Sequence, residues 1–345
     1  MEFFLIFYFV INFVIILLIL RSQLVYSIFT EQNIGAQKIH SHKVARSGGL
    51  VFILMFFIYF IYPDIDKKVL LYFYIFLIIG LIEDSLKNIN PNYRFMAIMI
   101  FSFLCIFDQN LLVNQLDIKF IDIFYANSFL LQFFFTSIAL SVAINAYNLI
   151  DGFNGLLLGI AIIGIIFILY SLKGNYFETN YYFLICALIT IFSLFLFNFP
   201  NGKLFTGDGG AYVIGFLIGY YSIKTYNDLN ISAWYFAVIL CYPMMELAIS
   251  FIRRLFFMNK QAFSADLMHL HSLLFMNLKN KNNFLSRYAN PFTSVIIWLF
   301  YLVQVSPLLF IINNSFYLKV NFIFSVLFYL LFYFFIVGKF NSIKY

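Results

Sequence analysis

The sequence predicts an all-α, polytopic membrane protein. Hydrophobic residues make up 63% of the 345-residue chain and charged residues only 10%, with 50 Phe and 25 Tyr. Apolar stretches recur that are long enough to cross a hydrocarbon core about 30 Å thick. Backbone amides in lipid must be bonded within their own segment, and these stretches exceed the length of barrel strands, so each is expected to be a helix.

Eleven apolar stretches are predicted to span the membrane within one domain, residues 1–345. They cover residues 3–24, 48–63, 68–83, 95–112, 128–149, 155–172, 181–198, 209–226, 232–252, 292–312 and 319–338. The first stretch is expected to be a retained span for two reasons. It lacks the basic start of a signal peptide, and it is longer than the apolar region of a typical signal peptide. Cys105, Cys186 and Cys241 fall inside these stretches, so neither a disulfide framework nor a metal cluster is expected.

The distribution of positive charge predicts the orientation of the chain. Most of the 21 Lys and Arg residues fall on one of the two alternating sets of connections, and the positive-inside bias assigns that set to the cytoplasm. The N-terminus is then outside and the C-terminus inside. All four histidines and the acidic motifs fall on the same set, so one face is expected to carry a site.

Two of the cytoplasmic elements combine charge with a helix end. Residues 38–49 are basic and end in a glycine pair at a helix entrance, which favours anionic groups; the alternative is an anchor for lipid headgroups. Glu83 and Asp84 close the third stretch. One could act on substrate as a base or metal ligand while the other pairs with a basic group, or both are ordinary acidic groups at a helix end.

Oxygen ligands occur in two further motifs. Asn145, Asn148 and Asp151 have i, i+3, i+6 spacing, which keeps three side chains on one side of a helix and suits Mg²⁺. Hydrogen bonding between helices is the alternative for the asparagines. Asp208 lies between glycines at 207 and 209–210, where a bound metal could bridge a diphosphate; a glycine-rich turn is the alternative.

The longest cytoplasmic connection, residues 253–291, is the expected specificity loop. It begins with Arg253-Arg254 and contains His269 and His271. Two histidines two residues apart diverge on a helix, so a zinc pair is not expected. Imidazoles near phosphate or sugar hydroxyls are the favoured interpretation.

The order of these motifs resembles the polyprenyl-phosphate N-acetylhexosamine-1-phosphate transferases of glycosyltransferase family 4, which start the assembly of O antigens, teichoic acids and other bacterial glycans. The resemblance covers roughly residues 35–275, and the last two stretches add only topology. The family's elements match, residue by residue, Lys38, His40, Arg46, Glu83, Asp84, Asn145, Asn148, Asp151, Asn154, Asp208, His269 and His271. Asn154 stands where many members have a second Asp, and Glu83 where Asp is common.

The resemblance implies a single catalytic domain in the bacterial inner membrane that transfers a phospho-sugar from a UDP-N-acetylhexosamine to undecaprenyl phosphate and releases UMP. Asp208 and Asn148 are then expected to bind Mg²⁺, with Mn²⁺ as an alternative. Glu83, Asp84 and Asp151 are expected to be catalytic, with Asp84 acting on the lipid phosphate. The substrates are expected to contact Lys38, His40, Arg46, Asn145, Asn154, Arg253, His269 and His271. Among these, the two histidines and nearby basic residues are expected to hold the diphosphate or sugar of the donor. Membrane lipids are expected partners, nucleic acid is not, and a homodimer stays open.

Three alternatives remain. The peptidoglycan enzyme that transfers phospho-N-acetylmuramoyl-pentapeptide to the same lipid typically carries three consecutive histidines, whereas His269-Leu-His271 fits the simpler-sugar branch. A secondary transporter or lipid flippase would place charges near the bilayer midplane, for which Glu246 is the strong candidate. A non-catalytic scaffold would leave the ordered acidic and histidine motifs without a role.

Overall fold

The computed structural model describes residues 2–31, 44–86, 89–172, 179–256, 268–280 and 283–343. Nearly all of its regular structure is helical. The helices are α1 (Glu2–Arg21), α2 (Gln23–Phe29), η1 (Gly48–Leu54), α3 (Met55–Ile61), α4 (Lys67–Leu86), α5 (Pro91–Gln109), α6 (Lys119–Tyr125), α7 (Phe129–Leu149), α8 (Leu156–Ser171), α9 (Thr179–Asn198), α10 (Gly207–Leu229), α11 (Ala233–Phe256), α12 (Leu270–Lys279), α13 (Asn283–Arg287), α14 (Ala289–Val305), α15 (Leu308–Ile311) and α16 (Ser315–Ile343). Two short strands, β1 (Thr30–Glu31) and β2 (Val44–Ala45), pair antiparallel.

The all-α membrane fold is confirmed. A helix, or two in succession, lies at each of the eleven predicted stretches. Within the described residues, seven helices are long and apolar enough to span a membrane, and Gly48–Ile61 and Leu156–Ser171 are apolar but shorter. The count of eleven spans stays a prediction. The sequence did not predict α6, nor α12 and α13 inside the connection at residues 253–291.

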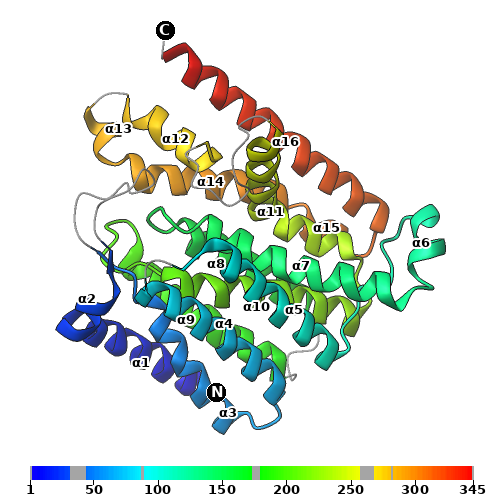
Figure 1. Cartoon of the computed structure of the whole chain (residues 1–345), viewed down its shortest axis with the longest axis horizontal. Helices are drawn as coiled ribbons and strands as arrows, with labels where there is room; N and C mark the ends of the chain where they lie inside the picture. The colour runs from blue at the N-terminus through cyan, green and yellow to red at the C-terminus, as the bar shows by residue number, and fades with distance from the viewer. Residues whose placement is uncertain are drawn as a thin grey trace.

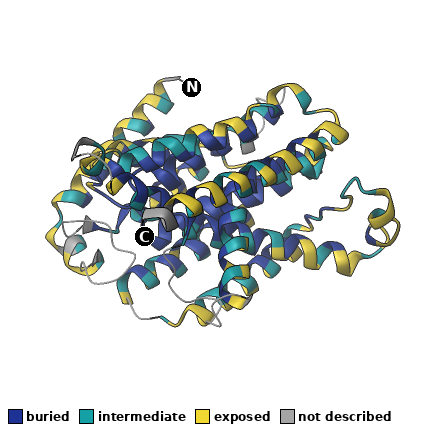
Figure 2. Ribbon diagram, turned by 90° about the horizontal axis from the view of Figure 1, so that it is seen from above, coloured by how far each residue is buried: buried dark blue, intermediate teal, exposed yellow. Residues whose placement is uncertain are grey.

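Helix α10 lies at the centre of the bundle. Every residue from Gly207 to Ile223 is buried, and the helix packs against α4, α7, α8 and η1. Small residues permit this packing: a Cβ added to Gly215 would lie 2.7 Å from the Cα of Ile144 on α7. The central helix is therefore surrounded by protein, whereas the outer helices carry many exposed positions (Figure 2). Large apolar side chains such as Phe60 of α3 and Leu331 of α16 are among the exposed residues. Exposed apolar surface on this scale suits contact with lipid.

The topology gathers the predicted motifs at one end of the bundle, called the motif end below. Neighbouring long helices run in opposite directions, so α4, α7 and α11 end there and α5, α8 and α10 begin there (Figure 1). Helices α12 and α13 lie at this end and α6 at the other (Figure 1).

Candidate active site

A carboxylate from α4 holds the first turn of α10. Asp84 accepts hydrogen bonds from the backbone N–H groups of Asp208 and Gly209, each 3.0 Å long. These bonds satisfy donors that a helix leaves unpaired at its N-terminus, and the negative charge complements the helix dipole. The sequence suggested that Asp84 acts on the lipid phosphate. Both of its oxygens receive backbone N–H groups of α10, and a direct action on the lipid phosphate stays a prediction.

The glycines around Asp208 bring protein backbones together. A Cβ on Gly80 of α4 would collide with the backbone of Gly209. Gly207 has a φ of +71°, and a Cβ there would lie 2.6 Å from Oδ2 of Asp84. Since this backbone conformation favours glycine, the motif is needed for the entry to α10. The expected close approach of backbone to a ligand is replaced by a close approach of α4 to α10.

Arg46 lies beside this pair of carboxylates. Its Nη2 is 3.3 Å from Oδ1 of Asp208, and its Nε is 3.9 Å from Oδ1 of Asp84. The side chain of Arg46 is 29% exposed, whereas that of Asp208 is 11% exposed and that of Asp84 is fully buried. Arg46 therefore supplies positive charge at the edge of the acidic pair, where a ligand can reach it.

The backbone after Arg46 is tied to the segment that leads into α10. The N–H of Gly48 donates to the carbonyl of Phe205 at 2.9 Å, and the N–H of Gly49 donates to the carbonyl of Thr206 at 2.8 Å. These two amides are therefore engaged within the protein. The glycine pair therefore joins the first motif to the fourth, and anion binding by the basic segment stays a prediction beside the anchor for lipid headgroups.

Glu83 has partners different from those of its neighbour Asp84. It forms an ion pair with Arg94 of α5 and accepts a hydrogen bond of 2.6 Å from the hydroxyl of Tyr212 on α10. The prediction that one acid of the pair binds a basic group is confirmed for Glu83. Tyr212 lies one turn after Asp208, so Glu83 also helps to fix α10. Sequence reasoning missed Arg94 and Tyr212, since neither lies in a recognised motif.

The asparagine motif lies at the end of α7. The side-chain amide of Asn145 donates to the carbonyl of Ser141 at 2.8 Å, and Oδ1 of Asn148 is buried without a hydrogen-bond partner in the described part of the chain. Helix α7 ends at Leu149, so Asp151 lies in the following turn. The expectation that all three side chains share one helix is wrong for Asp151, because the chain turns before reaching it.

Asn154 anchors this turn. Its Nδ2 donates to the carbonyl of Pro200 at 2.6 Å, and its backbone N–H donates to Oδ1 of Asn290 on α14 at 2.8 Å. The next amide, that of Gly155, donates to Oδ1 of Asn198. A carboxylate could not donate to the Pro200 carbonyl, which gives a physical reason for Asn at a position where related enzymes often have Asp.

The histidine pair surrounds a buried carboxylate. Nδ1 of His269 is 3.3 Å from Oε2 of Glu246, and Nδ1 of His271 is 3.5 Å from Oε1. The rings are stacked, with centroids 5.2 Å apart and planes within 1°. The predicted divergence is wrong, because His269 precedes α12 in an extended conformation and only His271 is helical. Glu246 is therefore paired at the motif end, which removes the charge on which the transporter interpretation depended.

The last two long helices, α14 and α16, also contact residues of the motif end. Arg253, a predicted donor-binding residue, donates from Nη1 to the carbonyl of Met268 at 2.9 Å and to the hydroxyl of Tyr333 on α16 at 2.6 Å. On α14, the ring of Trp298 lies against Gly159, and Asn290 binds the turn of Asn154. These contacts hold the motif loops from the C-terminal part of the chain, which carries no recognisable motif.

Lys38 and His40 lie outside the described residues, as do His42 and Asp266. Within the described ranges, no three His, Cys, Asp or Glu side chains gather around a metal-sized space. Mg²⁺ needs only one or two protein oxygens when water and phosphate fill its other positions. The orphaned Oδ1 of Asn148 and the carboxylate of Asp208 are such oxygens, so these residues fit the ion. The three cysteines are free and buried.

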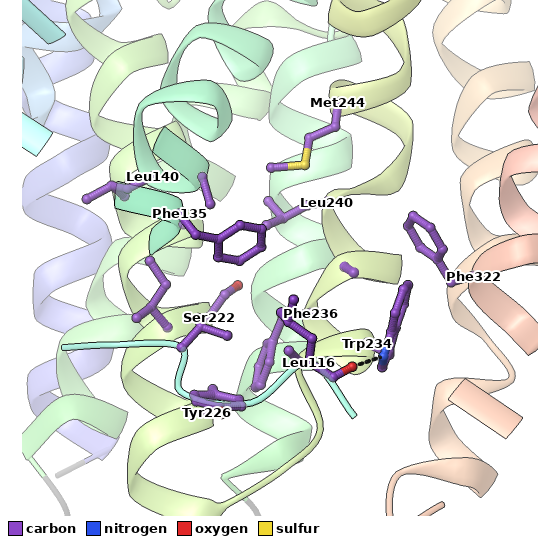
Figure 3. A pocket seen from close by; sticks show the side chains of 16 residues that line it. Leu116, Phe135, Leu140, Ser222, Tyr226, Trp234, Phe236, Leu240, Met244 and Phe322 are labelled. Atoms are coloured by element: carbon purple, nitrogen blue, oxygen red, sulfur yellow. Dashed lines mark hydrogen bonds between the residues drawn. The ribbon is translucent and has the colours of Figure 1, made fainter. Parts of the chain in front are cut away.

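An apolar cavity of about 290 Å³ lies between α7, α10, α11 and α16, away from these motifs. Figure 3 shows its wall, including Phe135, Leu240 and Phe322. The indole N–H of Trp234 donates to the carbonyl of Leu116 at 2.7 Å rather than into the cavity (Figure 3). A cavity with this lining offers little to a phosphate or sugar, so it is not the candidate active site.

Comparison with known proteins matches the middle of the chain to a family model. Residues 68–226 match the model of glycosyl transferase family 4. The chain is 31% identical over 129 residues to the undecaprenyl-phosphate alpha-N-acetylglucosaminyl 1-phosphate transferase of Thermotoga maritima, covering 37% of this chain and 38% of that protein. It is 36% identical over 141 residues to a probable undecaprenyl-phosphate N-acetylglucosaminyl 1-phosphate transferase of Bacillus subtilis, covering 38% and 37%.

A third relative bears a different name. The chain is 37% identical over 90 residues to the phospho-N-acetylmuramoyl-pentapeptide-transferase of Staphylococcus saprophyticus, covering 25% of this chain and 27% of that protein. The matched regions span less than two fifths of the length of each of these three relatives.

Proposed function

Because residues 68–226 match glycosyl transferase family 4, we propose that the chain transfers a phospho-N-acetylhexosamine from a UDP-sugar to undecaprenyl phosphate. The products are a polyprenyl-diphospho-sugar and UMP. The reaction would be the first membrane step of a cell-surface glycan, such as an O antigen or a teichoic acid. We place it on the cytoplasmic side of a bacterial inner membrane, where UDP-sugars and the lipid phosphate meet.

The observation that carries the proposal is the position of Asp208. Asp208 lies at the start of the central helix, where its backbone N–H donates to Asp84 and its carboxylate lies beside the part-exposed Arg46. Two anionic substrates must meet in this reaction, so positioning and charge neutralisation are the main requirements. A fixed carboxylate for a cation and a guanidinium for phosphate meet both requirements at one end of the bundle.

In the proposed step, an oxygen of the lipid phosphate attacks the β-phosphorus of the donor. The bond from that phosphorus to the oxygen bridging the two phosphates breaks, and its electron pair leaves with UMP. Arg46 binds phosphate oxygens, while Asp84 and Glu83 hold α10 so that Asp208 keeps its place. Asp151 supports the diphosphate, and the histidine pair binds the donor.

Asp208 and Asn148 would hold Mg²⁺ or Mn²⁺. When bound, the ion supplies positive charge against the diphosphate and the developing charge on UMP. The residues of the chain then orient the two substrates, exclude water and keep the lipid phosphate at headgroup depth.

The donor is proposed to be a simple UDP-N-acetylhexosamine. The spacing His269-Leu-His271 and the names of the first two relatives support it. The Staphylococcus relative supports the second candidate, UDP-N-acetylmuramoyl-pentapeptide. The two donors differ by a peptide, so a donor panel separates them directly.

The test is UMP release by the purified protein given undecaprenyl phosphate, Mg²⁺ and both donor classes. Asp208→Asn removes the charge while preserving shape, and we expect kcat to fall at least about a hundredfold. The matched control is Asp108→Asn, since Asp108 accepts a 2.7 Å hydrogen bond from Tyr72 at the opposite end of the bundle. Chelation of divalent ions should abolish wild-type release. A fully active Asp208→Asn variant with unchanged Mg²⁺ dependence would exclude the metal assignment.

A further inference from the structure

Glu246 is a carboxylate buried within a membrane-length helix. Its side chain is 1% exposed and lies inside the candidate span Ala233–Leu255. An uncompensated charge in this position is costly, and even a buried ion pair can often be replaced by apolar residues without loss of stability. Helix packing alone therefore does not explain a carboxylate here.

Glu246 contacts the start of α12 and His269, the residue that precedes it. Oε2 accepts the backbone N–H of Leu270 at 3.3 Å and faces Nδ1 of His269 at 3.3 Å, while Oε1 faces Nδ1 of His271 at 3.5 Å. An ionised carboxylate can only accept hydrogen bonds, so the contact with His269 favours a hydrogen on its Nδ1. The approach of His271 is an ion-pair contact, which holds its Nδ1 side toward the carboxylate without a hydrogen bond. Both rings then direct Nε2 away from Glu246.

An aromatic contact connects the histidine pair to the turn that contains Asp151. The ring of His271 meets that of Phe153 edge-on, with centroids 5.3 Å apart and planes at 72°. Phe153 lies in the turn between Asp151 and Gly155. The carboxylate of α11, the imidazoles of α12 and the turn after α7 are therefore in one continuous set of contacts.

The backbone at this point has separate supports. Arg253 and Tyr333 each bond to the carbonyl of Met268, at 2.9 Å and 3.1 Å. These bonds hold the chain where it enters α12, whereas Glu246 contacts the imidazole rings themselves. Removing the charge of Glu246 should therefore alter ring orientation while leaving the entry to α12 attached.

We infer that Glu246 is a positioning residue for the donor: it fixes both imidazoles so that their Nε2 edges meet the phosphate or sugar groups of a UDP-sugar. This rests on the proposed function for the identity of the ligand. Oriented in this way, Nε2 accepts a hydrogen bond from a sugar hydroxyl when the ring is neutral and donates to a phosphate oxygen when it is protonated.

The experiment compares wild type with Glu246→Gln, Glu246→Asp, His271→Gln and the double variant Glu246→Gln/His271→Gln. Asp108→Asn is the matched control, because it also removes a carboxylate charge. Asp108 accepts a hydrogen bond from a tyrosine far from the motif end. Two readouts are measured on folded, detergent-purified protein. The first readout is steady-state kinetics, which gives kcat, the KM for the UDP-sugar and the KM for undecaprenyl phosphate. The second readout is the rate at which diethyl pyrocarbonate modifies His269 and His271, followed by mass spectrometry.

For Glu246→Gln, we expect the donor KM to rise about tenfold or more, with the lipid KM changed less than about twofold. Carbethoxylation of both histidines should be several-fold faster than in wild type, and Glu246→Asp should lie between the two. If Glu246 acts through His271, the double variant will be no worse than the more impaired single variant. Asp108→Asn should match wild type in both readouts.

Equal changes in both KM values, additive effects in the double variant or unchanged histidine modification would overturn the inference. A Glu246→Gln protein that does not fold leaves Glu246→Asp as the deciding variant, for which wild-type donor KM and modification rates would also refute it. The modification readout needs no turnover. If wild type releases no UMP with any donor, the proposed function fails, while histidine modification still tests the positioning by Glu246.

Discussion

Asn154 occupies a position where this fold would disfavour a carboxylate. Its amide donates to the Pro200 carbonyl, and the residue is 7% exposed, so a charge there would face a carbonyl oxygen without compensating solvent. Asp84 shows the opposite case, since its charge is matched to two N–H groups of a helix start. At the residue scale, the polarity of these two side chains follows from the atoms opposite their hydrogen-bonding groups.

We therefore predict that Asn154→Asp lowers the free energy of unfolding by about 1–3 kcal/mol, because a donor is lost and an unpaired charge is buried. Thermal unfolding in detergent provides the measurement. Asn127→Asp is the matched control, because Asn127 also donates to a backbone carbonyl, that of Ile123, but is exposed. Equal unfolding temperatures for Asn154→Asp and wild type would contradict the assigned contact.

At the scale of elements, the contact of α4 with α10 sets the site. Both acids at the end of α4 bond to α10, and the two helices approach at glycines. The sequence predicted the two helices and their acidic ends, because apolar length and charge are local features. It could not predict which backbone amides the acids would bind, since that depends on the packing of segments more than 120 residues apart.

Gly80→Ala tests this contact. The added Cβ would collide with the backbone of Gly209, so we expect a loss of about 1–3 kcal/mol in stability and reduced UMP release as Asp208 shifts. Gly338→Ala on α16 is the control, because a Cβ there meets nothing within 4 Å and alanine favours helix. If Gly80→Ala retains both stability and activity, α4 and α10 are not in the close contact described.

At the scale of the whole molecule, alternating helices bring motifs from five parts of the chain to one end. The sequence predicted this gathering from the side of the membrane on which each motif falls. It did not predict the separate groups around Asp208 and Glu246, or the support from α14 and α16. These depend on lateral packing, about which the positive-inside bias carries no information.

The proposed orientation places the motif end in the cytoplasm. A cysteine can be introduced at one of two exposed positions at opposite ends of the bundle. These are Asn280, after α12, and Asn127, between α6 and α7. In intact cells, we expect a membrane-impermeant thiol reagent to label Asn127→Cys and to label Asn280→Cys only after permeabilisation. The native cysteines are buried and should react slowly in either case. The reverse labelling pattern would invert the topology and place the site outside.

The most direct measurement of the central claim follows the phosphorus atom itself. UDP-N-acetylhexosamine labelled with ³²P at the β-phosphate is incubated with the protein, undecaprenyl phosphate and Mg²⁺, and the lipid and aqueous phases are separated. The account predicts that the label enters the lipid phase while unlabelled UMP accumulates, and that Asp208→Asn prevents both. Label that stays in the aqueous phase as UDP while sugar enters the lipid would show transfer of sugar without its phosphate and contradict the account.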